Sequence, residues 1–480
     1  MSFRSGIVYG SLVFKTIAKR GQSSANVPIK NWSRINIWHC RKYGSAALDK
    51  ELHLPLKESI IMKISDSPEF HACLTNEVAI LKNLFHQNGH ELRIVGGAVR
   101  DLLLGIKPVD LDFATTATPS DMKELFTANE IRLINSNGEK HGTITARIGE
   151  RNFEVTTLRV DILTDGRHAT VEFTKNWLLD ANRRDLTINS MYLDFQGNLY
   201  DYFNGYEDLK ARTIRFVGDA VKRIQEDYLR ILRYFRFYGK IAREPDNHIE
   251  STLAAIKENS KGLANISGER IWVELNKICT GNYACEILEK IVSLNVGKYI
   301  GFPDTCNLDE LKTVSSHLKK NGVPYKPMTL LSALFNTEQE LEVFYKRIKP
   351  STLEKTLGIF ILANRNKKWN EKPLRALQRC VINSQNVSHT ISHVHEFLKY
   401  SDQIELLKEF ENWKVPKLPI DGNQLRKAGI DGRKIGLVLN KLKDIWIDND
   451  FNINQEELLQ RVPDVVANLS PTVNTKKMRV

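Results

Sequence analysis

The sequence predicts an α/β domain followed by a long all-helical region. Between about residues 85 and 200, short apolar segments with strand character alternate with helical segments and glycine turns. Beyond about residue 206, apolar residues recur with helical spacing almost throughout, up to Leu469. The chain has 480 residues, 42% apolar and 26% charged, which is the balance of a soluble globular protein with more than one domain. No uninterrupted apolar run approaches the roughly 18 residues of a membrane span.

The elements of the α/β region follow in order. Residues 62–88 have helical spacing and end at Gly89, and "ELRIVGG" then predicts a short strand that enters a glycine turn. "AVRDLLLG" predicts a helix, and "VDLDFAT" the next strand. A second helix covers "TPSDMKELFTA", with Thr118 or Ser120 as its N-terminal cap, and a strand hairpin turns at Gly149.

The N-terminal 48 residues differ from the rest of the chain. They contain no Asp or Glu, eight Lys or Arg, and many serines and alanines mixed with apolar residues. This composition is typical of a mitochondrial transit peptide. A disordered basic arm that binds nucleic acid is the alternative, but an arm would not need the apolar content. Met62 is a candidate internal start, which would give an untargeted form in the cytoplasm and nucleus.

The net charge is weak evidence for a polyanionic partner. Removing the eight N-terminal cations from the total of +12 leaves +4 for all other residues. The eight are Arg4, Lys15, Lys19, Arg20, Lys30, Arg34, Arg41 and Lys42.

Two adjacent glycines, Gly96 and Gly97, stand between the first strand and the helix that follows it. Such a pair allows a polyanion to approach backbone N–H groups at a helix N-terminus. The segment lacks the Gly-Lys-Ser/Thr of a P-loop. Most Gly-Gly pairs are only turns, so this pair alone is weak evidence.

Asp110 and Asp112 follow in "VDLDFAT". On a strand, residues i and i+2 point to one face, so both carboxylates project together. A divalent cation relieves their repulsion, and Mg²⁺ is commonly bound by one or two carboxylates together with substrate phosphates. Glu154, on a later strand, is a candidate third carboxylate. A second Asp-x-Asp pair in "WIDNDF", at residues 448 and 450, is interpreted as a surface loop between helices, because it does not follow a glycine turn on an apolar strand.

Two charged segments complete the set of candidates. "NRRDLTINSM" carries Arg183, Arg184 and Asp185, which are equally consistent with ribose and phosphate contacts and with a charged helix start. "EDYLRILRYFRF" carries one acid and then an arginine at every third position on a predicted helix: Asp227, Arg230, Arg233 and Arg236. Taken alone, this helix would be a basic amphipathic segment packed through its leucines and phenylalanines.

Several of these segments, in this order, resemble the class II CCA-adding tRNA nucleotidyltransferases. They are "GGAVRD", "DLDFATTATP", "RRDLTINSM", "DYFNGYEDLKARTIRFVGDA" and "RIQEDYLRILRYFRF". The resemblance is dense over residues 91–280, including "ISGERIWVELNKI", thins through the helical body and returns faintly at "LPIDGNQLRKAGIDGRKIG". The eukaryotic mitochondrial members are the most similar, in agreement with the N-terminal segment.

The resemblance implies a nucleotidyltransferase head with the polymerase β-like fold, a mixed β-sheet with flanking helices, followed by an all-α neck, body and tail. The expected boundaries are 1–48 for the transit peptide, 62–205 for the head, 206–270 for the neck with the helix that selects the base, 271–400 for the body and 401–480 for a tRNA-binding tail.

The resemblance also implies how the base is selected. Asp227 and Arg230 would pair with the edge of the incoming base, where cytosine and adenine both offer an amino donor beside a ring-nitrogen acceptor. Uracil and guanine reverse this pattern, and each mispaired buried group costs about 1–3 kcal/mol. Arg233 and Arg236 would meet phosphates, or an acid that positions Arg230. Arg100 and Arg184 would complete the nucleotide pocket, together with Gly96, Gly97 and Asp185.

The implied reaction is attack of the tRNA 3′-hydroxyl on the α-phosphate of CTP or ATP, with release of pyrophosphate. Asp110 and Asp112 would hold the Mg²⁺ (or Mn²⁺) that assists it. Lys427, Arg433 and Lys434 are candidate tRNA contacts in the tail, although a solvated basic face explains them equally well. Oligomeric state does not follow from the sequence.

Two other functions remain open at this point: a poly(A) polymerase of the same superfamily, and an inert RNA-binding protein. The presence of both aspartates, "RRD" and "EDYLR" argues against inertness, since a lapsed site would be free to lose them.

Overall fold

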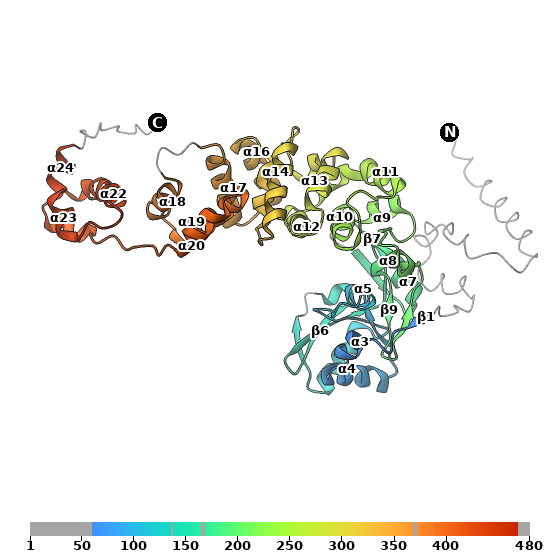
Figure 1. Cartoon of the computed structure of the whole chain (residues 1–480). Helices are drawn as coiled ribbons and strands as arrows, with labels where there is room; N and C mark the ends of the chain where they lie inside the picture. Colours follow the sequence, from blue (N-terminus) through green and yellow to red (C-terminus); the bar gives the residue numbers. More distant parts are fainter. Residues whose placement is uncertain (1–59, 136–137, 165–168, 368–371, 469–480) are drawn as a thin grey trace, which may run out of the picture. The chain divides into compact units, whose positions relative to one another are not determined.

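A computed structural model describes residues 60–135, 138–164, 169–367 and 372–468 of the chain. The segment predicted to be a transit peptide, residues 1–48, lies outside them. The chain divides into two compact units (Figure 1). The first comprises Met1–Ala211 with Arg215–Glu226, and the second Arg212–Ile214 with Asp227–Val480. The division falls within the predicted neck, immediately before Asp227.

An eight-stranded mixed sheet forms the centre of the first unit, in the order β1-β10-β9-β2-β3-β6-β5-β4. Strands β3 and β6 pair in parallel, and every other neighbouring pair is antiparallel. The strands of this sheet are β1 (Ile60–Lys63), β2 (Leu92–Val95), β3 (Asp112–Thr115), β4 (Arg132–Asn135), β5 (Thr143–Ile148), β6 (Arg151–Thr157), β9 (Tyr192–Leu193) and β10 (Asn198–Tyr200). A separate two-stranded sheet contains β7 (Arg159–Thr164) and β8 (Ala169–Phe173).

Short helices flank this sheet, as the predicted fold class requires. They are α3 (Pro68–Cys73), α4 (Asn76–Gln87), α5 (Gly97–Leu103), α6 (Pro119–Ala128), α7 (Trp177–Asn182), α8 (Gly205–Lys210) and α9 (Ala220–Glu226). Helices α4 and α5 pack against β2, and α6 packs against β4 and β5. The most deeply buried aromatic side chains include Phe85 on α4, Phe113 on β3 and Phe126 on α6. Phe85 and Phe126 meet edge to face, with ring centroids 5.9 Å apart.

Local sequence signals account for the helix and hairpin boundaries of this unit. Thr118 caps α6 in a reciprocal capping box with Asp121, which confirms the first of the two predicted caps. Gly149 has φ +58° between β5 and β6, which confirms the predicted hairpin. The single helical segment predicted over residues 62–88 is wrong. Its first residues belong to β1, which pairs with β10, and the cap at Ser67 before Pro68 starts a separate helix.

From Asp227 onward, the described part of the chain contains helices and no β-strand. The α-helices are α10 (Arg230–Ile241), α11 (Glu250–Asn259), α12 (Gly268–Cys279), α13 (Ala284–Ser293), α14 (Leu308–Asn321), α15 (Pro327–Leu331), α16 (Glu338–Ile348), α17 (Thr352–Asn364), α18 (Pro373–Ile382), α19 (Val387–Tyr400), α20 (Ile404–Asn412), α21 (Gly422–Lys427), α22 (Gly432–Asp448), α23 (Gln455–Gln460) and α24 (Val462–Ala467). Among the described residues, none of the helices combines the length and apolarity needed to span a membrane.

The last four helices share a hydrophobic cluster of their own, in which Trp446 of α22 is almost fully buried. Helix α18 is tied to the end of α22 by ion pairs: Arg379 contacts Asp444 and Asp448, and Arg375 contacts Asp450. The second Asp-x-Asp pair of the sequence is therefore neutralised by arginines. Asp448 is the last residue of α22 rather than part of a loop.

Candidate active site

The glycine turn after β2 lies against two of the predicted arginines. Gly96 has φ +63°, which strongly favours glycine, and leads directly into α5. A Cβ atom at Gly96 would lie 3.6 Å from Nη1 of Arg184, and one at Gly97 would lie 3.5 Å from Nη2 of Arg100. With no side chain at either position, the guanidiniums lie directly beside the backbone of the turn. The sequence predicted all four residues, and the structure brings them together.

Arg184 is held by a buried anchor that the sequence did not reveal. Its Nη2 lies 3.1 Å from Oδ2 of Asp180, and its Nε donates to the hydroxyl of Tyr192 at 3.2 Å. Tyr192 in turn donates to Asp180 at 2.6 Å, and Arg183 pairs with the other carboxylate oxygen at 2.8 Å. Within the described residues, the hydrogen bonds of Arg184 run through Nε and Nη2, which leaves Nη1 beside Gly96.

This anchor keeps its charges at neutral pH. Burial opposes ionisation of Asp180, but the two neighbouring guanidiniums and the Tyr192 hydroxyl outweigh it and hold the pKa of Asp180 well below its usual range. Burial likewise disfavours the charged form of Arg184, but Tyr192 and Asp180 more than compensate, so the pKa of Arg184 is raised. Arg184 is thus a fixed, permanently charged donor.

Arg100 and Asp185 are joined through Asn189. Nη1 of Arg100 donates to Oδ1 of Asn189 at 2.7 Å, and the amide nitrogen of Asn189 donates to Oδ1 of Asp185 at 3.3 Å. Asp185 also accepts from the backbone N–H of Leu186 at 2.8 Å. Asp185 is buried, and its contacts orient Asn189 and, through Asn189, the Arg100 guanidinium beside the glycine turn.

The candidate metal-binding carboxylates lie on the strands β3 and β6 and in the bend before β3. Asp112 opens β3 and is in register with Glu154 on the parallel strand β6, so both side chains share one face. Asp110 was predicted to lie on the same strand, but it precedes β3 in a bend. Burial raises the pKa of Asp112, Glu154 and Asp110 raise it further, and Arg184 opposes them. Arg184 therefore acts on the carboxylates as well as on the glycine turn.

This donor set fits a divalent cation. Carboxylate oxygens are the ligands that Mg²⁺ and Mn²⁺ prefer, and a cation would remove the repulsion that raises the pKa of Asp112. As they stand, no three His, Cys, Asp or Glu side chains of the described residues are close enough to form a complete metal cluster. A cation here would thus need further ligands, such as phosphate oxygens of a nucleotide.

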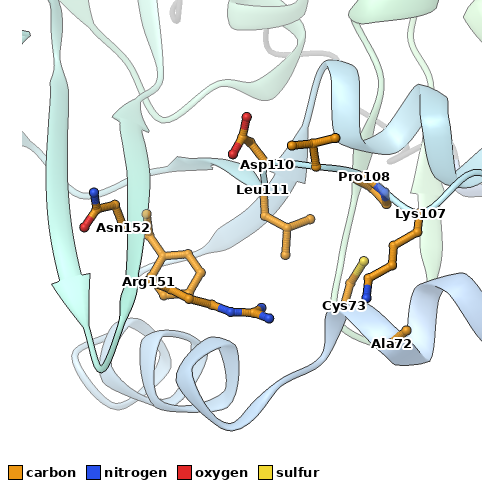
Figure 2. A pocket seen from close by; sticks show the side chains of 10 residues that line it. Ala72, Cys73, Lys107, Pro108, Asp110, Leu111, Arg151 and Asn152 are labelled. Atoms are coloured by element: carbon orange, nitrogen blue, oxygen red, sulfur yellow. The ribbon is translucent and has the colours of Figure 1, made fainter. Parts of the chain in front are cut away.

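A cavity of about 370 Å³ lies behind the bend that carries Asp110. Lys107, Asp110, Leu111, Arg151 and Asn152 line it, together with residues of α3. Figure 2 shows the side chain of Leu111 pointing into the cavity, whereas the Asp110 carboxylate is turned away from Arg151. The Asp110 carboxylate and the Leu111 side chain therefore point to different sides of the bend.

The predicted base-selecting residues lie in the second unit. The sequence predicted that Asp227 lies on the helix, but it lies in the turn before the helix. Helix α10 begins at Arg230. Oδ1 of Asp227 accepts from the backbone N–H of Leu229 at 3.1 Å, and Oδ2 accepts from Nη2 of Arg270 on α12 at 2.7 Å. The backbone N–H of Arg230 donates to the carbonyl of Asp227 at 3.0 Å.

The other two arginines of α10 face a buried acid. Nη1 of Arg236 donates to Oε1 of Glu274 on α12 at 3.2 Å, and Nη1 of Arg233 lies 3.9 Å from the same oxygen. Both guanidiniums also lie over the ring of Phe237. Glu274 and Arg270 were not predicted. Their position in "ERIWVE", four residues apart and with opposite charges, was the available signal.

The predicted tail contacts are exposed. Lys427 is the last residue of α21, and Arg433 and Lys434 occupy the first turn of α22. The side chain of Arg433 is 90% exposed and pairs with Asp431, which caps α22. These residues form a basic surface, and nothing in their packing requires them to be basic.

Comparison with known proteins matches both units. The family described as "Poly A polymerase head domain" matches residues 92–215, and the one described as "Probable RNA and SrmB- binding site of polymerase A" matches residues 248–307. The chain is 52% identical over 412 residues to the mitochondrial CCA tRNA nucleotidyltransferase 1 of Mus musculus, covering 85% of this chain and 94% of the mouse protein. The corresponding Homo sapiens protein is 51% identical over 416 residues, covering 86% and 95%.

The fold also matches a solved structure. The Bacillus stearothermophilus CCA-adding enzyme in complex with CTP superposes with a TM-score of 0.63 and 25% sequence identity. The match covers 83% of this chain and 98% of the bacterial one.

Proposed function

The chain belongs to the class II CCA-adding tRNA nucleotidyltransferases, and we propose that it completes tRNA 3′ ends with CCA, using CTP and ATP. The tRNA 3′-hydroxyl attacks the nucleotide α-phosphate, and pyrophosphate leaves. The observation that carries this proposal is the convergence of Arg184, the Gly96 turn and the carboxylates of β3 and β6 within one unit. The relatives, which are named for CCA addition, support it.

Asp110 and Asp112 are the proposed metal ligands, and Glu154 is a candidate third. A divalent cation such as Mg²⁺ or Mn²⁺, when bound there, supplies a positive charge that lowers the pKa of the attacking hydroxyl and stabilises charge on the phosphate oxygens. The protein holds these carboxylates at and near the first residue of β3, and it keeps Arg184 charged beside them.

The nucleotide triphosphate is proposed to bind over the glycine turn. Nη1 of Arg184 and Nη2 of Arg100 lie beside this turn. Two guanidiniums fixed by Asp180 and Asn189 need no reorganisation when a polyanion arrives, which favours tight and oriented binding. Asp185 supports this arrangement through its hydrogen bond from Asn189.

Base selection is assigned to Asp227 and Arg230. A carboxylate accepts from the exocyclic amino group of cytosine or adenine, and a guanidinium donates to the adjacent ring nitrogen. With uracil or guanine both contacts are mismatched, at a cost of about 1–3 kcal/mol each. Arg236 and Arg233 are engaged with Glu274 and are proposed to stiffen α10 and to contribute charge near the nucleotide.

The tail is proposed to bind tRNA through phosphates. Lys427, Arg433 and Lys434 are exposed on adjoining helices, so each is accessible to a phosphate, although Arg433 would have to exchange or share its ion pair with Asp431. Mitochondrial location is supported by the names of the mouse and human relatives and by the composition of residues 1–48. A second form that starts at Met62 would remain in the cytoplasm and nucleus.

Separate incubations with single nucleotides test the function. A tRNA that ends at its discriminator base is incubated with Mg²⁺ and labelled CTP, ATP, UTP or GTP, alone or combined. We expect two additions with CTP, one more when ATP is present, and none with UTP or GTP. Long tails from ATP alone would instead identify a poly(A) polymerase. Binding of tRNA without any addition would identify an inert RNA-binding protein.

A further inference from the structure

The carboxylate of Asp227 is fixed by two donors from different parts of the second unit. Its Oδ1 accepts from the backbone N–H of Leu229 at 3.1 Å, and its Oδ2 accepts from Nη2 of Arg270 at 2.7 Å. Arg270 and Asp227 are 33% and 23% exposed, so the pair is partly shielded but still open to a ligand. A side chain with two rotatable bonds that is held at both oxygens has one orientation.

The two hydrogen bonds leave Asp227 able to bind a base. Each carboxylate oxygen has two acceptor sites, and each uses one of them here. An amino group of a base needs only one more. The contacts therefore set the plane of the carboxylate without exhausting its capacity to accept. The planar guanidinium suits this task because its donors have fixed directions.

Helix α12 holds both ends of the base-selecting segment. Arg270 contacts Asp227 before α10, while Glu274, one helical turn further along α12, contacts Arg236 on α10. Residues i and i+4 lie on the same helix face, so a single face of α12 presents a cation to the acid and an acid to the arginines. These two contacts from α12 fix the position of the Asp227 turn relative to α10.

From this geometry we propose that Arg270 is a positioning residue that determines base selectivity, because it orients the Asp227 carboxylate toward the edge of the incoming base. The proposal rests on the base-selecting role of Asp227 proposed above. Without Arg270 the Asp227 carboxylate keeps, among the residues that the structure describes, only the Leu229 contact and can rotate. It can then turn away from the carbonyl oxygen of uracil, so a mismatch is penalised less.

The test measures selectivity rather than activity alone. Full-length protein and its Arg270→Ala and Arg270→Lys variants are assayed for kcat/KM with CTP and with UTP, on a tRNA ending at its discriminator base. We expect Arg270→Ala to lower the CTP-to-UTP ratio about tenfold, the size expected from one mispaired group. Arg270→Lys keeps a donor and the charge but not the planar geometry, so it should restore part of the ratio.

A neighbouring ion pair provides the matched control. Lys349 contacts Glu269, the residue before Arg270, at 3.4 Å, and both side chains are exposed. Lys349→Ala therefore removes a charge pair from the same end of α12 without touching Asp227, and it should keep the wild-type ratio. If Arg270→Ala slows CTP and UTP addition equally and leaves the ratio unchanged, Arg270 serves only the fold and the inference is wrong.

Variants of Asp227 separate this inference from the proposed function. Asp227→Ala should lower the ratio by itself, and adding Arg270→Ala to it should cause no further change, because the two act through one contact. A normal ratio in Asp227→Ala would overturn the proposed role of Asp227. A changed ratio in Asp227→Ala with a normal ratio in Arg270→Ala would overturn only the role of Arg270.

Discussion

Asp112 and Glu154 occupy matching register positions on the parallel strands β3 and β6, so their carboxylates project from the same face of the sheet. Burial and then the charge of Glu154 raise the pKa of Asp112. Protons and a divalent cation therefore compete for Asp112 at a higher pH than they would at an isolated aspartate, whose ordinary pKa is about 4.

Glu154→Gln removes one of the charges that raise this pKa. The pKa of Asp112 should fall, so the acid limb of the pH profile for CTP addition should move to lower pH at a fixed Mg²⁺ concentration well below saturation, where protons compete with the cation. If Glu154 is also a ligand, the Mg²⁺ concentration for half-maximal rate should rise in the same variant. Glu150→Gln, at the exposed hairpin tip between β5 and β6, is the control and should change neither quantity. An unmoved acid limb in Glu154→Gln would contradict the assigned coupling.

Asp110→Asn and Asp112→Asn should each abolish addition of every nucleotide. The loss of several kcal/mol of transition-state stabilisation corresponds to a rate reduction of about 1000-fold or more. Binding of tRNA, measured by filter retention, should remain within about twofold of wild type, because both residues lie far along the chain from the basic tail. A variant that still added C at a near-normal rate would show that the metal ligands lie elsewhere.

Asp180→Asn should reveal the anchor beneath Arg184. At neutral pH the variant leaves two guanidiniums without their buried counter-ion, so we expect a loss of stability of about 3 kcal/mol. Because the pKa of Asp180 is lowered in the folded protein, its contribution is complete above its ordinary pKa and disappears as the pH falls toward the folded value.

The thermal midpoints of wild type and Asp180→Asn should therefore converge as the pH is lowered below about 4. A midpoint difference that stayed constant through the acid range would mean that the carboxylate charge is not what stabilises the fold. The KM for CTP should also rise in Asp180→Asn at neutral pH, since Arg184 loses its fixed orientation.

Replacing Lys427, Arg433 and Lys434 together by Ala should weaken tRNA binding and leave selectivity intact. Each lost phosphate contact lowers the slope of log affinity against log salt by roughly one, so a reduction of about three is expected if all three residues contact phosphates. The ratio of CTP to UTP addition should not change. An unchanged salt slope would identify these residues as an ordinary solvated surface.

Local patterns in the sequence revealed those parts of the site in which the chemistry is carried by neighbouring residues. A pattern of only a few residues was enough to identify the Gly96–Gly97 turn, the Asp-x-Asp pair and the "RRD" segment. The strands β7 to β10 were harder to predict, because some are two or three residues long and are defined by their partners rather than by their own pattern.

The residues that hold the catalytic side chains could not be predicted in this way. The hydrogen bond from Tyr192 on β9 to Asp180 forms only in the folded protein. Arg270 likewise contacts Asp227, although 43 positions separate them in the sequence. A short-range pattern carries no information on such pairings. The position of Asp227 was mispredicted for a related reason: its side chain caps the turn before α10 instead of continuing the helix.

The most direct test of the central claim is to sequence the 3′ ends that the protein makes on a tRNA lacking its terminal nucleotides, with all four nucleotides and Mg²⁺ present. We expect ends that read CCA and then stop, and in Asp227→Ala we expect ends in which U or G appears. Tails of repeated A, or no new nucleotides on a tRNA that is demonstrably bound, would contradict CCA addition by this protein.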